Sequence, residues 1–422
     1  MTYRDTPDNA AASQTPASAA RLGGSPTDGV AAMTLDASLG RQMAHALNEL
    51  RAGRTIIVSD DQDREDEADL VMAAQMATPE NIAFMIRHTS GVLCAALTAE
   101  RVAELRLPPM VLDGDDPRGT AFTVSVDLKD ATSTGISAAD RAATLRALAM
   151  PRSTAGTFSR PGHIFPLRAR PGGVLHRTGH TESAVDLCTL AGLQPAGVLC
   201  ELVNDDGTMM GGAELTEFAD RHRLVRISVA DIVRYRQITE TLVEREATAW
   251  LPTEHGEFAA AGYRSLIDGT EHLALYRGDA DKEASNPCAP TPVRIHVECA
   301  VGDIFSSRRC RCRERLLASL RTVAGATHGI VVYLRQDDRS QRARTGDRPY
   351  LVGGWDAARN HADASHDLPP TVDQLDLAAQ ILRDLGASNI SLPDGDVQAR
   401  AVLTEHGLTI SAGQRLHDAT GS

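Results

Sequence analysis

The chain has 422 residues, of which 42% are hydrophobic, and carries a formal net charge of −13. This length predicts two domains, and the negative charge argues against a nucleic-acid-binding protein, which would need a basic face. No apolar run is long enough to cross a membrane, and the N-terminus lacks the basic-then-apolar order of a signal peptide. Seven cysteines fit a reducing cytosol better than a disulfide framework, so we expect a cytoplasmic protein.

The first half of the chain divides into a tail and a patterned region. Residues 1–33 are rich in Ala, Ser, Thr, Pro and Gly without periodicity, which predicts a disordered tail. From Leu35 onward, apolar residues recur with the periods of helices and strands. This pattern predicts helices over 39–50, 80–88, 137–149 and 215–222, and a further helix that residues 177–182 open and that runs to Leu190. It predicts strands over 55–58, 92–97, 122–126, 196–202 and 224–229.

The second half begins after a long predicted helix. Asp231 is expected to cap this helix, which runs to about Thr248 and marks the domain boundary. Beyond it, the pattern predicts strands over 257–263, 272–276, 294–299 and 329–334, and helices over 312–323 and 375–385. Because both halves mix strands and helices, we expect α/β or α+β domains over 34–248 and 249–422.

An acidic segment, Asp60–Asp69, directly follows the apolar strand at 55–58. Its carboxylates repel one another unless a cation lies among them, and hard oxygen ligands suit Mg²⁺, which keeps other positions for water and substrate. The alternative is a solvated acidic turn. Glu65 and Glu67 would face the same side of an extended loop. Asp63 and Asp69 would either transfer protons or only solvate the loop.

A second polar cluster, Arg177–Glu182, opens a predicted helix. Thr181 and Glu182 fall in its first turn, where free backbone N–H groups and the helix dipole attract an anion. Arg177 adds a cationic fork for phosphate, and His180 can ligate a metal. A lone histidine at a helix start is more often a cap or a surface residue, but this combination of residue types indicates a phosphate site.

Six segments in the first half of the chain resemble the motifs of a known family. Residues 35 to about 240 closely resemble 3,4-dihydroxy-2-butanone 4-phosphate synthase, a riboflavin-pathway enzyme. The matching segments are Asp61-Gln-Asp-Arg-Glu-Asp-Glu-Ala-Asp69, Arg87-His-Thr-Ser-Gly91, Thr134-Gly-Ile-Ser-Ala-Ala-Asp-Arg141, Arg160-Pro-Gly-His-Ile-Phe-Pro-Leu-Arg168, Arg177-Thr-Gly-His-Thr-Glu182 and Cys200-Glu-Leu-Val-Asn-Asp-Asp-Gly-Thr-Met209. Ala68 stands where the family usually has glycine.

The resemblance implies a reaction and a set of site residues. Members convert D-ribulose 5-phosphate to formate and L-3,4-dihydroxy-2-butanone 4-phosphate with Mg²⁺ or Mn²⁺. By resemblance, Glu65 and His180 ligate the metal, and His163 and Glu201 are catalytic. The implied substrate contacts are Arg64, Glu65, Asp69, Arg177, Thr178, Gly179, His180, Thr181 and Glu201. The family also implies a mixed sheet with flanking helices and a homodimer. Cys94 would lie near the pocket, although a small buried apolar role is the simpler interpretation.

The C-terminal half resembles GTP cyclohydrolase II, which is often fused to the synthase. The segment Arg294–Cys299 precedes Cys310-Arg-Cys312, so the spacing Cys-x10-Cys-x-Cys of the family's zinc triplet is intact. Cys299, Cys310 and Cys312 plus a water would form an open zinc site. The alternatives are a vestigial metal site or three unrelated thiols. The resemblance implies an α/β domain with its own zinc ion.

The other motifs of that second family are altered. Asp338 stands where the family has glycine in Gln-Glu-Gly-Arg, and it should repel a triphosphate. The catalytic Asp and Arg positions align with Thr371 and Asp373, Arg315 stands where a substrate-contacting Gln is usual, and Leu392–Val397 replaces the guanine and phosphate contacts. We therefore expect an active synthase with a degenerate cyclohydrolase-like domain and no GTP turnover. The alternatives are a bifunctional enzyme and a C-terminal nucleotide-binding or docking module.

Overall fold

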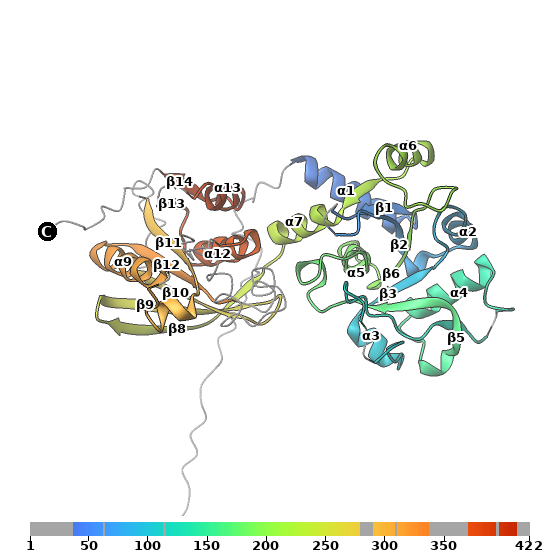
Figure 1. Ribbon diagram of the computed structural model, residues 1–422, viewed down its shortest axis with the longest axis horizontal. Coiled ribbons are helices and arrows are strands. Elements are labelled where there is room, and N and C mark those ends of the chain that lie inside the picture. The colour runs from blue at the N-terminus through green and yellow to red at the C-terminus, as the bar shows by residue number, and fades with distance from the viewer. Residues whose placement is uncertain are drawn as a thin grey trace, which may run out of the picture. The chain divides into compact units, whose positions relative to one another are not determined.

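The computed structural model describes residues 37–61, 64–112, 115–130, 132–278, 290–308, 310–336, 370–393 and 396–411. The predicted tail over 1–33 lies outside these residues, as do Asp63 and Cys288. Two seven-stranded mixed sheets are present, each with helices on both faces (Figure 1). The expected fold class of two α/β domains with mixed sheets is confirmed. No helix in the described part of the chain is long and apolar enough to cross a membrane.

The first sheet has the strand order β4-β5-β3-β6-β2-β1-β7. Its central pairs β1–β2, β2–β6 and β3–β6 are antiparallel, whereas β3–β5 and β1–β7 are parallel. The strands are β1 (Ile56–Ser59), β2 (Ala68–Ala73), β3 (Cys94–Leu97), β4 (Val126–Leu128), β5 (Phe158–Arg168), β6 (Ala196–Glu201) and β7 (Arg226–Ser228). The connection from β1 to β2 is the acidic segment, so the sheet itself carries the first candidate site.

Helices pack on both faces of this sheet (Figure 1). One face carries α1 (Ala37–Arg51), α5 (His180–Leu190) and α7 (Val229–Thr239); the core on the other face includes α2 (Pro79–His88), α4 (Ala138–Ala149) and α6 (Gly212–His222). Ile57 and Leu70 belong to one core, and Ile56, Val58 and Val71 to the other. Successive strand side chains point to opposite faces, so one buried strand supplies both cores.

Short helices and caps complete the first domain. They are η1 (Ala74–Met76), α3 (Ala99–Glu104), η2 (Ala155–Thr157) and η3 (Gly173–Leu175). The predicted cap of α4 is confirmed, because the Ser137 hydroxyl accepts the backbone N–H of Asp140 at 3.1 Å. Thr78 caps α2 in the same way. These side chains satisfy N–H groups that have no intrahelical partner.

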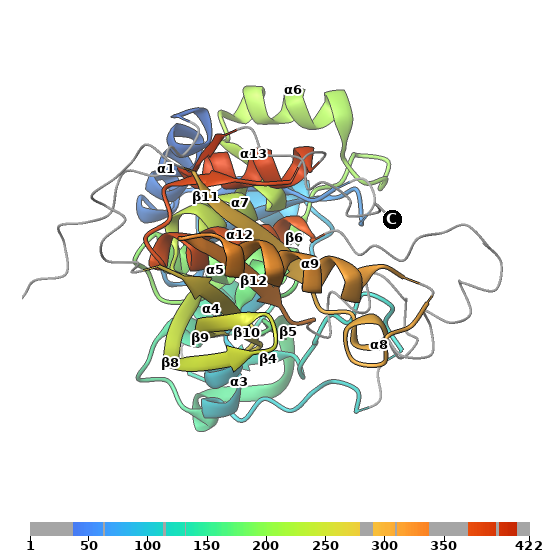
Figure 2. The same cartoon turned by 90° about the vertical axis from the view of Figure 1, so that its left-hand side faces the viewer.

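The second sheet has the order β14-β13-β11-β12-β10-β9-β8. Its strands are β8 (Val243–Thr253), β9 (Gly256–Ser265), β10 (Glu271–Arg277), β11 (Thr291–Val297), β12 (Gly329–Leu334), β13 (Asn389–Ser391) and β14 (Thr409–Ser411). One face packs against α9 (Cys312–Gly325), and the other against α12 (Val372–Asp384) and α13 (Val397–Glu405). The short helix α8 (Ala300–Asp303) lies close to α9 (Figure 2).

The prediction of one helix from Asp231 to Thr248 is wrong. Ser228 is the N-cap, Asp231 is its partner in a capping box, and α7 ends at Thr239. The chain from Val243 instead forms β8, which pairs antiparallel with β9 over its whole length. Local periodicity fits either structure here, and the long-range strand pairing decides between them.

The strand predicted over 122–126 is mostly absent. Only Val126 belongs to β4, while Thr123 bridges Pro109 and Phe122 bridges Leu167 as isolated pairs. Neighbouring residues thus form single bridges to different segments, and no continuous ladder forms here. Alternation in the sequence indicated extended backbone, but it could not indicate the separate partners.

Candidate active site and thiol cluster

The acidic segment folds around the carboxylate of Asp60 at the end of β1. This carboxylate accepts the backbone N–H groups of Glu65 at 3.2 Å and Glu67 at 3.0 Å. It also accepts Nη1 of Arg64 at 2.8 Å, and the same guanidinium contacts Glu65. The side chain of Asp60 is almost fully buried. The described residues of this segment, 60–61 and 64–69, are therefore held by these contacts rather than forming a solvated acidic turn.

This loop brings three metal-ligating side chains together with the start of α5. The ligand atoms of Asp60, Glu65 and His180 all lie within 4.8 Å of one another. Glu65 Oε2 is 3.6 Å from Nδ1 of His180. The sequence analysis named Glu65 and His180 but not Asp60. The available signal was its position, because Asp60 is the first acidic residue after a buried strand.

The donor set suits a hard divalent cation. Two carboxylates and one imidazole leave coordination positions for water and substrate, as Mg²⁺ and Mn²⁺ require. Nε2 of His180 is buried and has no hydrogen-bond partner among the described residues. A buried polar atom of this kind is uncommon in folded proteins. The residues present therefore fit a bound metal ion.

The charges of the cluster are strongly coupled. The nearby His180, with help from Arg64, holds the pKa of Glu65 at about 2 against the opposing effect of burial. Burial lowers the pKa of His180, but Asp69 and Glu65 raise it more, to about 9. Without metal, His180 is thus an imidazolium paired with carboxylates. A metal ion must replace that proton.

Asp69 and Glu201 meet across two strands. They are direct partners in the β2–β6 register, and burial raises the pKa of Asp69 to about 7. The Glu201 carboxylate accepts the hydroxyl of Ser90 at 2.7 Å. A carboxyl group that titrates near neutrality is suited to holding and releasing a proton.

The N-terminus of α5 offers backbone donors. Gly179 is its N-cap, and the first intrahelical bond runs from Ser183 N to Gly179 O at 2.9 Å. The preceding N–H groups, including that of Thr181, make no bond within the helix. A Cβ on Gly179 would lie 2.3 Å from Nη1 of Arg177, so glycine is required for the guanidinium to lie over the helix start.

The guanidinium of Arg177 donates hydrogen bonds to three protein groups beside the start of α5. Its Nη1 donates to Glu182 at 2.6 Å, and its Nη2 donates to Thr120 Oγ1 at 3.2 Å and to the carbonyl of Arg118 at 3.1 Å. The sequence predicted a fixed cationic fork for phosphate at Arg177. The structure shows a guanidinium fixed beside the helix start, with Thr178 half-buried next to it.

The remaining named residues are distributed around the sheet. His163 lies in β5, with its ring against Asp127 of β4. Cys94 is 4% exposed in β3, and burial raises the pKa of its thiol. A buried neutral thiol behaves as a small apolar side chain.

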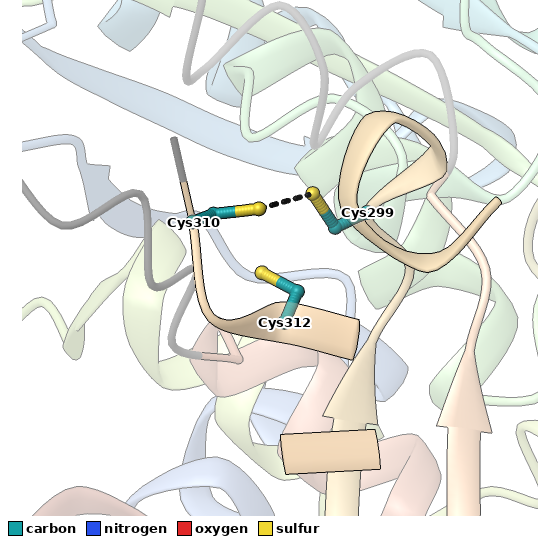
Figure 3. A group of neighbouring side chains, drawn as sticks. All are labelled: Cys299, Cys310 and Cys312. Atoms are coloured by element: carbon teal, nitrogen blue, oxygen red, sulfur yellow. Dashed lines mark hydrogen bonds between the residues drawn. The ribbon is translucent and has the colours of Figure 1, made fainter. Parts of the chain in front are cut away.

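The second cluster lies in the other domain. Sγ atoms of Cys299, Cys310 and Cys312 all lie within 4.8 Å of one another, and Cys299 and Cys310 are 3.9 Å apart (Figure 3). The three side chains converge from the start of α8 and from the segment that begins α9 (Figure 3). The neighbouring Cys299 and burial raise the pKa of Cys312. A divalent cation would relieve this crowding of thiolates, so the residues fit Zn²⁺.

The backbone around the thiols is closely fitted. A Cβ on Gly302 would lie 2.7 Å from Sγ of Cys310. The Asp303 carboxylate accepts the backbone N–H of Cys299 at 2.9 Å and also contacts Nε2 of His296 and the Tyr333 hydroxyl, each at 3.0 Å. These contacts fix the direction of Cys299.

Some altered cyclohydrolase positions have structural roles. Thr371 is the N-cap of α12 and forms a capping box with Gln374, and Asp373 lies in the first turn of that helix. Gln336 donates to the carbonyl of Glu298 at 2.7 Å. Asp338 lies outside the described residues, as does part of the segment 392–397.

The fold and the two clusters define a class: a two-domain α/β protein with one carboxylate–imidazole cluster and one thiol cluster. A family model of 3,4-dihydroxy-2-butanone 4-phosphate synthase matches residues 44–235, and one of GTP cyclohydrolase II matches residues 244–415.

Individual relatives extend over both domains. The riboflavin biosynthesis protein RibBA of Salinispora arenicola is 48% identical over 369 residues, covering 87% of this chain and 86% of that protein. RibBA of Mycobacterium tuberculosis is 45% identical over 371 residues, with 86% of each chain covered. The crystal structure of RibBX, a two-domain synthase from A. baumannii, matches with a TM-score of 0.67 and 34% identity, covering 88% of this chain and 99% of that one.

The chain therefore belongs to the 3,4-dihydroxy-2-butanone 4-phosphate synthase family of riboflavin biosynthesis, in the form that carries a GTP cyclohydrolase II domain. The family resemblance inferred from the sequence motifs is confirmed in both halves.

Proposed function

We propose that the N-terminal domain converts D-ribulose 5-phosphate to formate and L-3,4-dihydroxy-2-butanone 4-phosphate with Mg²⁺ or Mn²⁺. One observation carries this proposal. Asp60, Glu65 and His180 converge within 4.8 Å in the domain that matches the synthase model. These ligands come from a strand exit and a helix start that are far apart in the sequence, so their convergence is not a product of local acidity.

The reaction enolises a ketose, rearranges its carbon skeleton and expels formate. Enolisation needs a base for a carbon-bound proton and positive charge near the developing oxygen anion. A divalent cation, which Asp60, Glu65 and His180 would hold, would supply that charge. His163 and Glu201 are the bases that we assign. Asp69, with its pKa raised to about 7, can carry a proton between steps.

The substrate phosphate is assigned to the start of α5. The backbone N–H groups of residues 180–182 precede the first intrahelical bond, and the helix dipole adds positive potential there. Arg177 is fixed beside this helix start by Glu182. Arg64 is anchored by Asp60 within the acidic loop, where its charge offsets that of the carboxylates.

For the C-terminal domain, we propose zinc binding without GTP hydrolysis. The thiol cluster and the Asp303 contacts to Cys299 support a zinc site. Thr371, at the family's catalytic Asp position, is engaged as a helix cap, which supports the loss of hydrolysis. A bifunctional enzyme is the second candidate, favoured by the GTP cyclohydrolase II match. A nucleotide-binding module is the third.

Formate release tests both halves, since both ancestral reactions expel formate. The full-length protein is given Mg²⁺ and Zn²⁺ with ribulose 5-phosphate or GTP in separate tubes. We expect formate from the sugar phosphate alone. Formate from GTP would support the bifunctional alternative, whereas GTP binding without formate would support the module. Folded protein that releases no formate from the sugar phosphate would overturn the main proposal.

We also propose a homodimer, supported by the family resemblance. The chain has a mass of 45.0 kDa, so a dimer has about twice that mass. Sedimentation equilibrium distinguishes the two states, and a single species with the mass of one chain would reject the dimer.

A further inference from the structure

His163 is bound to Asp127 through two separate contacts. Oδ2 of Asp127 lies 2.7 Å from Nδ1 of the imidazole, and Oδ1 accepts the backbone N–H of His163 at 2.9 Å. A carboxylate oxygen can accept a hydrogen bond from this nitrogen when the ring carries its proton on Nδ1. The neutral imidazole then has its lone pair on Nε2. Both the ring orientation and its tautomer follow from one carboxylate.

Two glycines allow this pair to form. A Cβ on Gly162 would lie 2.0 Å from the carbonyl carbon of Val126, so only glycine permits the close approach of β5 to β4. The register between these strands shifts at Val126 and Asp127. Gly135, at φ +89°, covers the pair, because its Cβ would lie 2.1 Å from Asp127 Oδ2. Three separate chain segments are thus shaped around the contact.

The two side chains differ in exposure. Asp127 is 11% exposed, whereas His163 is 40% exposed. Nε2 of His163 has no hydrogen bond to any residue that the structure describes, so the reactive edge of the ring is open. The Asp127 carboxylate is therefore mostly buried, and the His163 imidazole is accessible to solvent.

We propose that Asp127 is a positioning residue that orients His163 and fixes its tautomer for proton transfer at Nε2. This inference rests on the proposed function, in which His163 accepts a proton from a substrate carbon. The proton moves to Nε2, the electron pair of the C–H bond moves toward the carbonyl oxygen, and Asp127 stays ionised beside the resulting imidazolium. Misplacing such a base costs roughly 10²- to 10⁴-fold in rate.

The test is Asp127→Asn in the full-length protein. The carbonyl oxygen of the introduced amide would keep the backbone N–H of His163, which leaves the amide NH₂ facing Nδ1 as a donor. The ring must then carry its proton on Nε2, the wrong tautomer for a base. We expect kcat to fall by roughly 10²-fold or more with KM nearly unchanged. Asp220→Asn, at an exposed position of α6, is the matched control.

A second readout does not depend on activity. ¹⁵N-histidine NMR, with the His163 signals assigned by their absence in His163→Gln, reports which ring nitrogen is protonated. We expect Nδ1–H in the parent protein and Nε2–H in Asp127→Asn. An unchanged tautomer, or a kcat within twofold of the parent in folded Asp127→Asn protein, overturns the inference.

A double variant separates positioning from a general structural role. If Asp127 acts through His163, then adding Asp127→Asn to His163→Gln causes no further loss of kcat. Additive losses would show an independent role and reject the inference. If the parent protein releases no formate from ribulose 5-phosphate, the proposed function fails by itself, while the NMR comparison still decides whether Asp127 sets the tautomer.

Discussion

The two candidate metal clusters differ in what surrounds them. Asp60, Glu65 and His180 lie in a domain where Asp69 pairs with Glu201 across β2 and β6. The thiol cluster, within the described residues, is next to groups that hold its backbone in place, such as Asp303. A metal site becomes catalytic through the acid and base groups nearby, not through its ligands alone. The same chain thus carries one site equipped for proton transfer and one with structural support.

The largest expected effect is at the first cluster. Glu65→Gln keeps the shape but removes a ligand charge, so the metal ion loses a carboxylate and the enolate loses its counter-charge. We expect roughly a 10³-fold fall in kcat/KM, equivalent to about 4 kcal/mol of transition-state stabilisation. Formate release and Mn²⁺ binding by electron paramagnetic resonance are the measurements. Glu217→Gln, at an exposed position of α6, is the control. If Glu65→Gln were nearly as active as the parent, the first cluster would not be the catalytic one of the two.

Metal affinity at the first cluster should depend on pH. The pKa of His180 is raised to about 9 in the metal-free protein, and a ligating imidazole must be neutral. Below pH 9 the metal displaces one proton, so affinity should rise by about tenfold per pH unit between pH 7 and 9. Titration calorimetry across this range measures the slope. His180→Gln should bind weakly with no such slope, and a flat profile in the parent protein would contradict the assigned charge state.

The ion pair of Glu65 with His180 predicts how the stability of the metal-free protein depends on pH. The folded pKa of Glu65 is depressed to about 2, so its contribution is lost as pH falls from about 4.5 toward 2. The folded pKa of His180 is raised to about 9, so its contribution is lost as pH rises from about 6.5 to 9. Urea unfolding in EDTA should show a maximum between these limits, and added Mg²⁺ should remove the alkaline decline. Equal stability at pH 6 and pH 9 without metal would contradict the pairing.

At the thiol cluster we expect an effect on stability rather than on synthase rate. Cys310→Ser removes one of three zinc ligands, and zinc binding contributes directly to folding free energy. Zinc content should fall from one ion per chain toward zero, and the melting temperature should fall by several degrees. Formate release from ribulose 5-phosphate should stay within about twofold of the parent. Thr322→Ala on α9 is the control. A large loss of synthase rate in Cys310→Ser would show that the two sites do not act independently.

The smallest expected effect comes from Gly302→Ala. The added Cβ would approach Cys310 Sγ to 2.7 Å, so the Cys310 thiol or the backbone beside it must shift to make room. We expect zinc still to bind, with affinity reduced by about tenfold, comparable to the loss of an outer-shell contact. Competition with a chromophoric chelator measures this change. Unaltered affinity would show that the cluster is looser than its geometry indicates.

Sequence reasoning reached much of the first site because its chemistry is local. The acidic run and the Arg177–Glu182 segment each contain the residue types that a metal or phosphate needs, and the family resemblance supplied His163 and Glu201. Asp60 was missed as a candidate ligand. Its role depends on how the loop folds back, since its carboxylate accepts N–H groups five and seven residues away.

The predicted element boundaries were wrong where strand pairing, rather than sequence periodicity, decides the structure. The extended helix to Thr248 was wrong because β9 offers Val243–Thr253 a strand partner. A helix does begin near Asp231, as predicted, but its N-cap is Ser228 rather than Asp231. Both errors concern residues whose short-range preferences are nearly balanced, and such residues follow their long-range contacts.

By itself, the sequence determined the family, the two-domain α/β class, the helix caps such as Ser137 and the identity of most candidate ligands. Each of these depends on residue type and spacing along the chain. Only the tertiary structure decided which side chains meet: His180 with the acidic loop, Asp69 with Glu201, and Asp127 with His163. These pairs are separated by 36 to more than 100 residues. Packing of buried strands fixes their register, because a shift of one residue would turn every side chain to the opposite face.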